Sequence, residues 1–105
     1  MKLKDSVRIL GAKPELVIAL MICDAIYSDN DERLTVTSIV DGHHSRTSRH
    51  YLGMAADLRT NNIDETTTAL ISLEIKRQLP EFYVVLENEG TPNEHIHIQF
   101  NGQHS

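Results

Sequence analysis

A strand is predicted over residues 94–100, because the side chains alternate strictly between polar and apolar from residue 95 to residue 100, and this pattern restricts the folds that the chain can adopt. A period of two is typical of a β-strand, whose successive side chains point to opposite faces of a sheet. The apolar members are expected to face a core: Ile96, Ile98 and Phe100. The polar members are expected to share the opposite face: His95, His97 and Gln99. The fold must therefore contain a sheet with one covered face and one polar face.

Further strands are predicted on both sides of the chain's midpoint. β-Branched or alternating residues predict three of them: residues 34–40, 53–59 and 82–87. Residues 88–93 are rich in turn-forming types, so the strand before them and residues 94–100 are expected to form an antiparallel hairpin.

Two helices complete the predicted elements. Apolar residues at helical spacing predict a helix from Pro14 to Tyr27 that is buried over much of its surface. A second helix is predicted to begin near Asn62 or Asp64 and to end before Pro80. This order of helices and strands predicts an α+β fold, with residues 1–105 as one domain whose extreme ends are loosely held.

Charge and composition exclude several classes of protein. The net charge of −5 argues against nucleic-acid binding, which needs a basic surface. The only cysteine, Cys23, cannot form an internal disulfide. The longest apolar run, residues 16–23, is far shorter than the roughly 20 residues that cross a bilayer, so no membrane insertion is expected.

Two histidines and an aspartate form a candidate metal site. His50 and Asp57 are seven residues apart with Gly53 between them, and His97 lies on the last predicted strand. Three ligands with one position left for water are typical of catalytic zinc, and a single cysteine excludes a cysteine-rich structural site. Iron(II) binds the same donors, although an oxygenase barrel needs about eight strands. Without a metal, Asp57 is expected to pair with Arg59 on the same strand face.

Two ordered motifs resemble one enzyme family. They are Ser48-x-His50-x-x-Gly53-x-Ala55-x-Asp57, preceded by Asp41-Gly42-x-His44, and His95-x-His97 on the last strand. They resemble the zinc D-Ala-D-Ala carboxypeptidase and endopeptidase family, peptidase family M15, which shares its fold with the Hedgehog signalling domain. The similarity runs from about the first helix to Phe100 and includes short phage-type members. It implies a Hedgehog/DD-peptidase-like α+β fold, with helices packed on one side of a small antiparallel sheet.

The resemblance also implies a set of site residues. One zinc ion per chain would be bound by His50, Asp57 and His97. Relatives use either an acidic residue three positions before the last ligand or a histidine two before it as the base, and here these positions hold Glu94 and His95. We expect Glu94 to be the general base and His95 to orient groups or stabilise the oxyanion. Regular strand alternation, however, would direct Glu94 away from the metal.

The predicted loop 41–49 holds three further candidates. Many relatives carry an arginine after the strand that corresponds to residues 36–38, where it holds the substrate carbonyl, and this chain lacks it. His44 and Arg46 are the candidates to replace it. Ser48 is expected to brace a ligand or, equally, to cap the local backbone.

The resemblance implies a zinc peptidase that hydrolyses peptidoglycan stem peptides or cross-links, as a carboxypeptidase or an endopeptidase. We expect a monomer made in the cytoplasm without a signal peptide, acting on the cell wall after lysis or export or as a phage component, a pattern that fits a phage lysin. The alternative is a catalytically inactive, metal-binding module on the same fold, which binds the cell wall or a partner.

Overall fold

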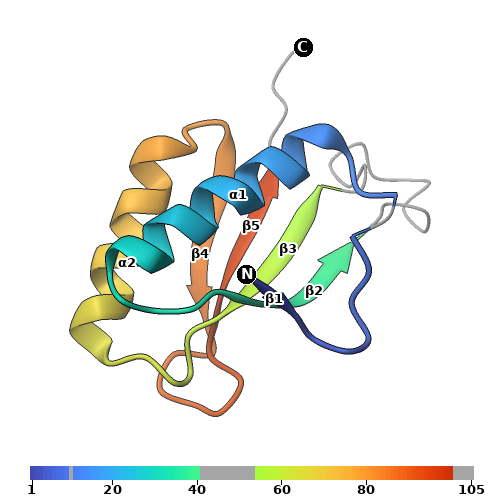
Figure 1. Ribbon diagram of the computed structural model, residues 1–105. Helices are drawn as coiled ribbons and strands as arrows, with labels where there is room; N and C mark the ends of the chain where they lie inside the picture. Colours follow the sequence, from blue (N-terminus) through green and yellow to red (C-terminus); the bar gives the residue numbers. More distant parts are fainter. Residues whose placement is uncertain (10, 41–53, 101–105) are drawn as a thin grey trace.

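The computed structural model describes residues 1–9, 11–40 and 54–100, which form two helices and five strands (Figure 1). The strands are Lys2–Leu3 (β1), Thr35–Val40 (β2), Ala55–Arg59 (β3), Phe82–Glu87 (β4) and His95–Phe100 (β5). The helices are Pro14–Asp29 (α1) and Glu65–Gln78 (α2). The predicted α+β class is confirmed. Within the described ranges, neither helix has the length and apolar character needed to cross a membrane.

The five strands form one mixed sheet in the order β1-β2-β3-β5-β4. β1 runs parallel to β2, so the predicted antiparallel sheet is wrong at this edge, while the other pairs are antiparallel. A two-residue strand is too short to show a periodic pattern in the sequence. It forms because the backbone N–H groups of Lys2 and Lys4 donate to the carbonyls of Leu34 and Val36, at 2.8 and 2.9 Å.

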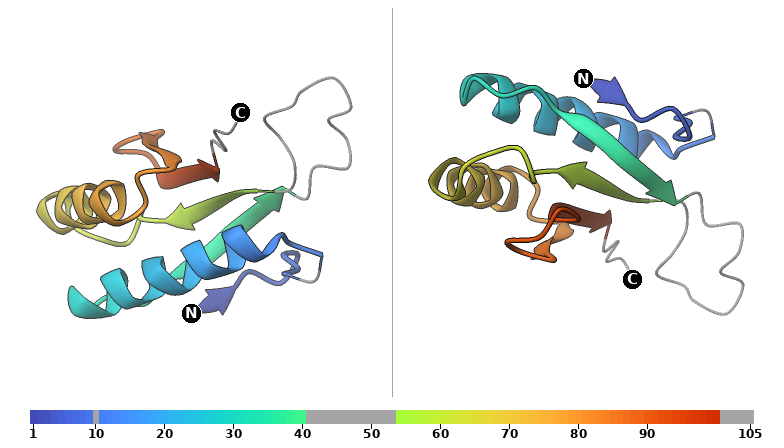
Figure 2. Two further views of the ribbon diagram at one scale, coloured as in Figure 1. Left: turned by 90° about the horizontal axis from the view of Figure 1, so that it is seen from above. Right: turned by 90° about the horizontal axis from the view of Figure 1, so that it is seen from below.

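Both helices pack against one face of the sheet. Figure 1 shows them over the strands, and Figure 2 shows them on the same side of the twisted sheet. The sheet contributes these fully buried side chains to the core: Val36, Ala56, Leu58, Ile96 and Ile98. The predicted inward face of residues 94–100 is therefore confirmed for both isoleucines. Phe100 is half-buried, with its ring centroid 5.3 Å from that of Phe82.

Helix α1 extends two residues beyond its predicted end at Tyr27. The backbone N–H of Asn30 donates to the carbonyl of Tyr27, and its side-chain amide donates to the carbonyl of Ile26, both at 2.9 Å. The polar residues after Tyr27 thus complete the last turn. The predicted burial holds for one side of the helix only, because Ile18 and Met21 are 58% and 61% exposed.

Within the described residues, no helix covers the other face of the sheet, which we call the open face. Its polar side chains come from four strands: Ser38, Asp57, Arg59, Glu87, His95 and His97. A register shift between Val36 and Ser38 in β2 places Ser38 opposite Asp57. The covered face therefore holds the core, and the open face holds most of the predicted site residues that the structure describes.

Candidate functional site

Asp57 and His97 lie directly opposite each other on β3 and β5. The ring Nδ1 of His97 donates to Oδ1 of Asp57 at 2.8 Å, although the two residues are 40 positions apart in the chain. Their side chains are about one quarter and one fifth exposed, at 25% and 20%. The structure thus brings two of the three predicted metal ligands together. The alternative partner, Arg59, forms no ion pair with Asp57 in the described part of the chain.

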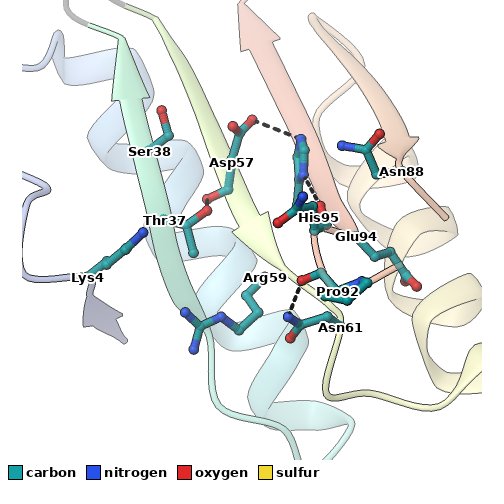
Figure 3. Close-up of a pocket in the computed structure, with 11 residues that line it drawn as sticks. Lys4, Thr37, Ser38, Asp57, Arg59, Asn61, Asn88, Pro92, Glu94 and His95 are labelled. Carbon is teal, nitrogen blue, oxygen red and sulfur yellow. Dashed lines mark hydrogen bonds and ion pairs between the residues drawn. The ribbon is translucent and has the colours of Figure 1, made fainter. Parts of the chain in front are cut away.

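His95 lies two residues before His97 on β5, so both side chains leave the same face of the strand. Figure 3 shows the ring of His95 next to the carboxylate of Asp57. Its Nε2 is 3.7 Å from Oδ1 of Asp57 and 2.9 Å from Oε1 of Glu87. Its Nδ1 faces the carbonyl oxygen of Asn93 at 2.7 Å. Two imidazoles and two carboxylates therefore lie side by side on the open face.

The surroundings raise the pKa of both histidines. For His97, the hydrogen bond to Asp57 is the main cause, and it outweighs the opposing effect of burial. For His95, burial is the largest influence and lowers the pKa. The hydrogen bonds to Asn93 and Glu87 and the charge of Asp57 together outweigh it. Both ring nitrogens of each histidine face oxygen acceptors, an arrangement that suits the protonated ring.

Glu94, the predicted base, has different partners. Its Oε2 accepts a hydrogen bond from the hydroxyl of Thr60 at 2.8 Å, and its Oε1 accepts one from the backbone N–H of Gly90 at 3.2 Å. Figure 3 shows its carboxylate directed away from Asp57 and His95. The residue precedes β5, and its hydrogen bonds to Thr60 and Gly90 hold the carboxylate away from the Asp57–His97 pair.

The remaining predicted site residues lie outside the described residues: His44, Arg46, Ser48 and the third ligand, His50. Within residues 1–9, 11–40 and 54–100, no group of three or more His, Cys, Asp or Glu side chains is placed to hold a metal ion. The predicted ligand set is therefore present here as the Asp57–His97 pair alone.

The chemistry of this pair fits zinc. A carboxylate oxygen and an imidazole nitrogen are both zinc donors, and two donors on one tetrahedral ion lie roughly 3.3 Å apart. The two atoms are hydrogen-bonded at 2.8 Å, so they would have to move apart by about 0.5 Å to bind one ion. A zinc-binding histidine usually donates its second ring N–H to an oxygen acceptor. Here Oε1 of Gln99 lies 3.1 Å from Nε2 of His97 and can fill that role.

A cleft of about 380 Å³ runs along the open face beside the pair. Six of its lining residues are Lys4, Ser38, Asp57, Arg59, Asn61 and His95. Lys4 follows β1 at one wall, and the loop between β4 and β5 forms the opposite wall (Figure 3). The side-chain amide of Asn61, which follows β3, donates to the carbonyl of Pro92 at 2.6 Å and so connects the end of β3 to this loop. Asp57 and His95 are thus accessible from the cleft.

Sequence reasoning missed Glu87, Gln99 and Thr60 as partners of the site. The hairpin pattern could have located Glu87, because its register decides which residue lies opposite His95. The predicted last strand, however, begins at Glu94, one residue before β5. A hairpin built on that prediction would pair Glu87 with Glu94, whereas the structure pairs Glu87 with His95. Thr60 lies beyond the end of β3, where no periodic pattern applies.

Comparison of the chain with protein-family models, with curated proteins and with solved structures finds no match. The residues of the open face and the motifs in the chain are therefore the features that indicate a function.

Proposed function

We propose that the chain is a zinc peptidase that hydrolyses peptide bonds in peptidoglycan stem peptides or cross-links. The observation that carries this proposal is the Asp57–His97 pair, whose donor atoms are 2.8 Å apart beside an open cleft. The motif around His50 supplies the third ligand in the proposal. The mixed sheet and the helices on one face are compatible with this assignment.

Asp57, His97 and His50 would hold the ion. When bound, zinc supplies Lewis acidity, which activates water and polarises a peptide carbonyl. Gln99 would keep the ring of His97 oriented by accepting its second N–H. The cleft would hold the peptide across the open face, next to the pair.

Two residues compete for the role of general base. The resemblance allows either residue, and the sequence favours Glu94, whose carboxylate must leave Thr60 and Gly90 to reach the pair. His95 needs no such movement, since its Nε2 is 3.7 Å from Asp57. Turnover by Glu94→Gln and His95→Asn decides between them. Loss in Glu94→Gln with bound zinc retained supports Glu94, and near-normal turnover in that variant with loss in His95→Asn supports His95.

The test of the function combines metal analysis with mass spectrometry of digested peptidoglycan. We expect one zinc ion per chain, and shortened stem peptides that appear with zinc and disappear with a chelator. Asp57→Asn should lose both the metal and the products, whereas the matched change Asp64→Asn, at the start of α2, should keep both. Intact peptidoglycan after incubation with the zinc-loaded protein would contradict the proposal.

An inactive metal-binding module is the second candidate. The observation that favours it is the position of Glu94, which two hydrogen bonds hold away from the pair. Binding of zinc and of peptidoglycan without release of any product would support this candidate over the peptidase.

A further inference from the structure

A second pocket lies between the beginning of α2 and the loop that joins β4 to β5. Its volume is about 410 Å³, the size of an ordinary small-molecule site. Figure 1 shows the first turn of α2 and this loop at the same end of the molecule. Of the described residues that line the pocket, Glu94 alone also lines the cleft of the open face, so the pocket is a different site from that cleft.

The pocket combines apolar and acidic walls. Ile63 and Leu86 are half-buried and pack against the hydrophobic core. Three carboxylates line the same space from three segments: Glu65 at the start of α2, Glu89 in the loop and Glu94 before β5. Within the described ranges, none of the three forms an ion pair, and no lysine, arginine or histidine lines the pocket. These walls repel an anion and match an alkyl chain that carries positive charge.

A buried hydroxyl group without a partner belongs to the same pocket. Thr68, near the start of α2, is 2% exposed and lines the pocket. Its Oγ1 is a buried side-chain oxygen for which the described part of the chain supplies no hydrogen-bond partner. A buried polar group in this state is costly and needs an explanation. A ligand ammonium group would supply the missing donor, because a hydroxyl oxygen accepts hydrogen bonds.

The spacing of the carboxylates favours an organic cation over a metal ion. Calcium draws its oxygen ligands to within about 2.6 Å. Across residues 1–9, 11–40 and 54–100, no group of three or more acidic side chains is close enough together to hold such an ion. Carboxylates that stand apart instead match ammonium groups spaced along an alkyl chain, each of which donates up to three hydrogen bonds.

The loop wall of the pocket is held in place by its own hydrogen bonds. The hydroxyl of Thr91 donates to the carbonyl of Asn88 at 2.7 Å, and the backbone N–H of Glu94 donates to the carbonyl of Thr91 at 3.0 Å. Oε1 of Glu94 accepts from the backbone N–H of Gly90 at 3.2 Å. The wall is therefore formed before a ligand arrives, and this reduces the entropy lost on binding.

We propose that this pocket binds an aliphatic diamine. Its alkyl chain would lie against Ile63 and Leu86, and its ammonium groups would bind the three glutamates and the hydroxyl of Thr68. Binding involves no covalent step. Neither zinc nor the Asp57–His97 pair takes part in it, so the inference goes beyond the proposed function and does not depend on it.

The test is a two-dimensional amide NMR titration of the full chain, with chelator present, against cadaverine, a five-carbon diamine. Two probes of the same chain length serve for comparison: n-pentylamine lacks one charge and pentanediol lacks both. Cadaverine should bind at least about 10-fold more tightly than pentanediol, because charged donors make stronger hydrogen bonds to carboxylates. It should also bind more tightly than n-pentylamine, and the amide signals of Thr68 and Gly90 should shift.

Variants assign the binding to the pocket. Glu89→Gln and Thr68→Val should each weaken cadaverine binding several-fold, up to about 10-fold. Glu81→Gln and Thr66→Val make the same changes at exposed positions outside the pocket and should keep the affinity. Because the hydroxyl of Thr68 has no partner in the described chain, Thr68→Val should not lower the stability to urea, and its lost affinity then reports on the ligand alone.

The results that would overturn the proposal are distinct. Equal binding of cadaverine and pentanediol would contradict a cation site, and equal binding of cadaverine and n-pentylamine would contradict the assignment to a diamine. A loss in Glu81→Gln as large as that in Glu89→Gln would show attraction to the acidic protein as a whole rather than to this pocket.

The same measurements keep this site apart from the proposed peptidase. Selective cadaverine binding by a chain whose zinc-loaded form leaves peptidoglycan intact would support the diamine site and contradict the peptidase. Cleavage of peptidoglycan by a chain that does not distinguish cadaverine from pentanediol would support the peptidase and overturn the diamine site.

Discussion

At the scale of single residues, the partners of His97 determine what the open face can do. One ring nitrogen faces Asp57 and the other faces Gln99, so a proton or a metal ion can occupy the first while the second stays hydrogen-bonded. The sequence predicted that His97 and Asp57 belong to one metal site, because both lie in recognisable motifs, but it did not predict a direct hydrogen bond between them. It did not predict the role of Gln99, because a polar residue on an outward strand position carries no pattern of its own.

Gln99→Leu should weaken zinc binding roughly 10-fold to 100-fold, the usual effect of losing a hydrogen bond behind a metal-binding histidine. The substitution removes the acceptor for Nε2 of His97 and leaves both proposed ligands of the described site, Asp57 and His97, in place. Competition with a chromogenic chelator measures the affinity. Gln78→Leu, the same change on α2, is the control. Equal zinc affinity in the two variants would contradict the role of Gln99.

The raised pKa values of His95 and His97 predict the pH dependence of stability in the chelator-treated protein. Their folded-state pKa values lie above the usual 6.5, so the folded state holds these protons more tightly. The stabilisation is complete below about pH 6.5. It is lost as the pH rises through the folded-state pKa values. The His97–Asp57 and His95–Glu87 pairs each contribute about 1 kcal/mol or less to stability, because all four side chains are partly exposed.

Urea unfolding between pH 5 and 9 measures this effect. The charged groups facing the two rings are the carboxylates of Asp57 and Glu87. The double variant with asparagine at positions 95 and 97 should lose the part of the pH dependence that these rings cause. Parallel stability curves for the two proteins would show that the histidines do not gain protons on folding.

At the scale of helices and strands, the sequence predicts those elements in which the apolar residues repeat regularly over enough residues to be recognised. The strand 82–87 is found as predicted, and the last strand and both helices are found with ends shifted by one to a few residues. β1 was missed because Lys2 and Leu3 show no period, and their pairing depends on where α1 returns the chain to β2. The shift at Ser38 was also missed, because a bulge depends on the neighbouring strand rather than on its own residues.

Tyr27→Phe should destabilise the protein by about 1 to 2 kcal/mol, because it removes the hydrogen bond that joins α1 to β3. The ring stays buried and its packing is unchanged, so the loss reports on the contact with the carbonyl of Arg59 alone. Tyr83→Phe makes the same change on an exposed side chain of β4 and should cost much less. Urea unfolding compares both with the parent chain. Equal stability of the two variants would show that this contact does not stabilise the fold.

At the scale of the whole molecule, the sheet separates stability from chemistry. The helices bury the apolar residues of one face, and the candidate site occupies the other. Buried apolar area is the main source of stability, and no residue of the Asp57–His97 pair belongs to the core. The sequence could predict this division from the alternation of residues 94–100. It could not predict the cleft, which depends on how β1 and the loop before β5 enclose Asp57 and Arg59.

This separation predicts how the protein responds to removal of zinc. The chelator-treated chain should keep its fold, because its core does not depend on the metal, unlike that of a zinc finger. Added zinc should then stabilise it by mass action, by about 2.7 kcal/mol at a free concentration 100 times the dissociation constant. Circular dichroism during heating measures both states, with Asp64→Asn as a control that keeps the shift and Asp57→Asn as a variant that loses it. If the chelated chain unfolds at room temperature, the metal is part of the structural core. If the unfolding temperature of the parent chain does not respond to zinc, the open face does not bind it.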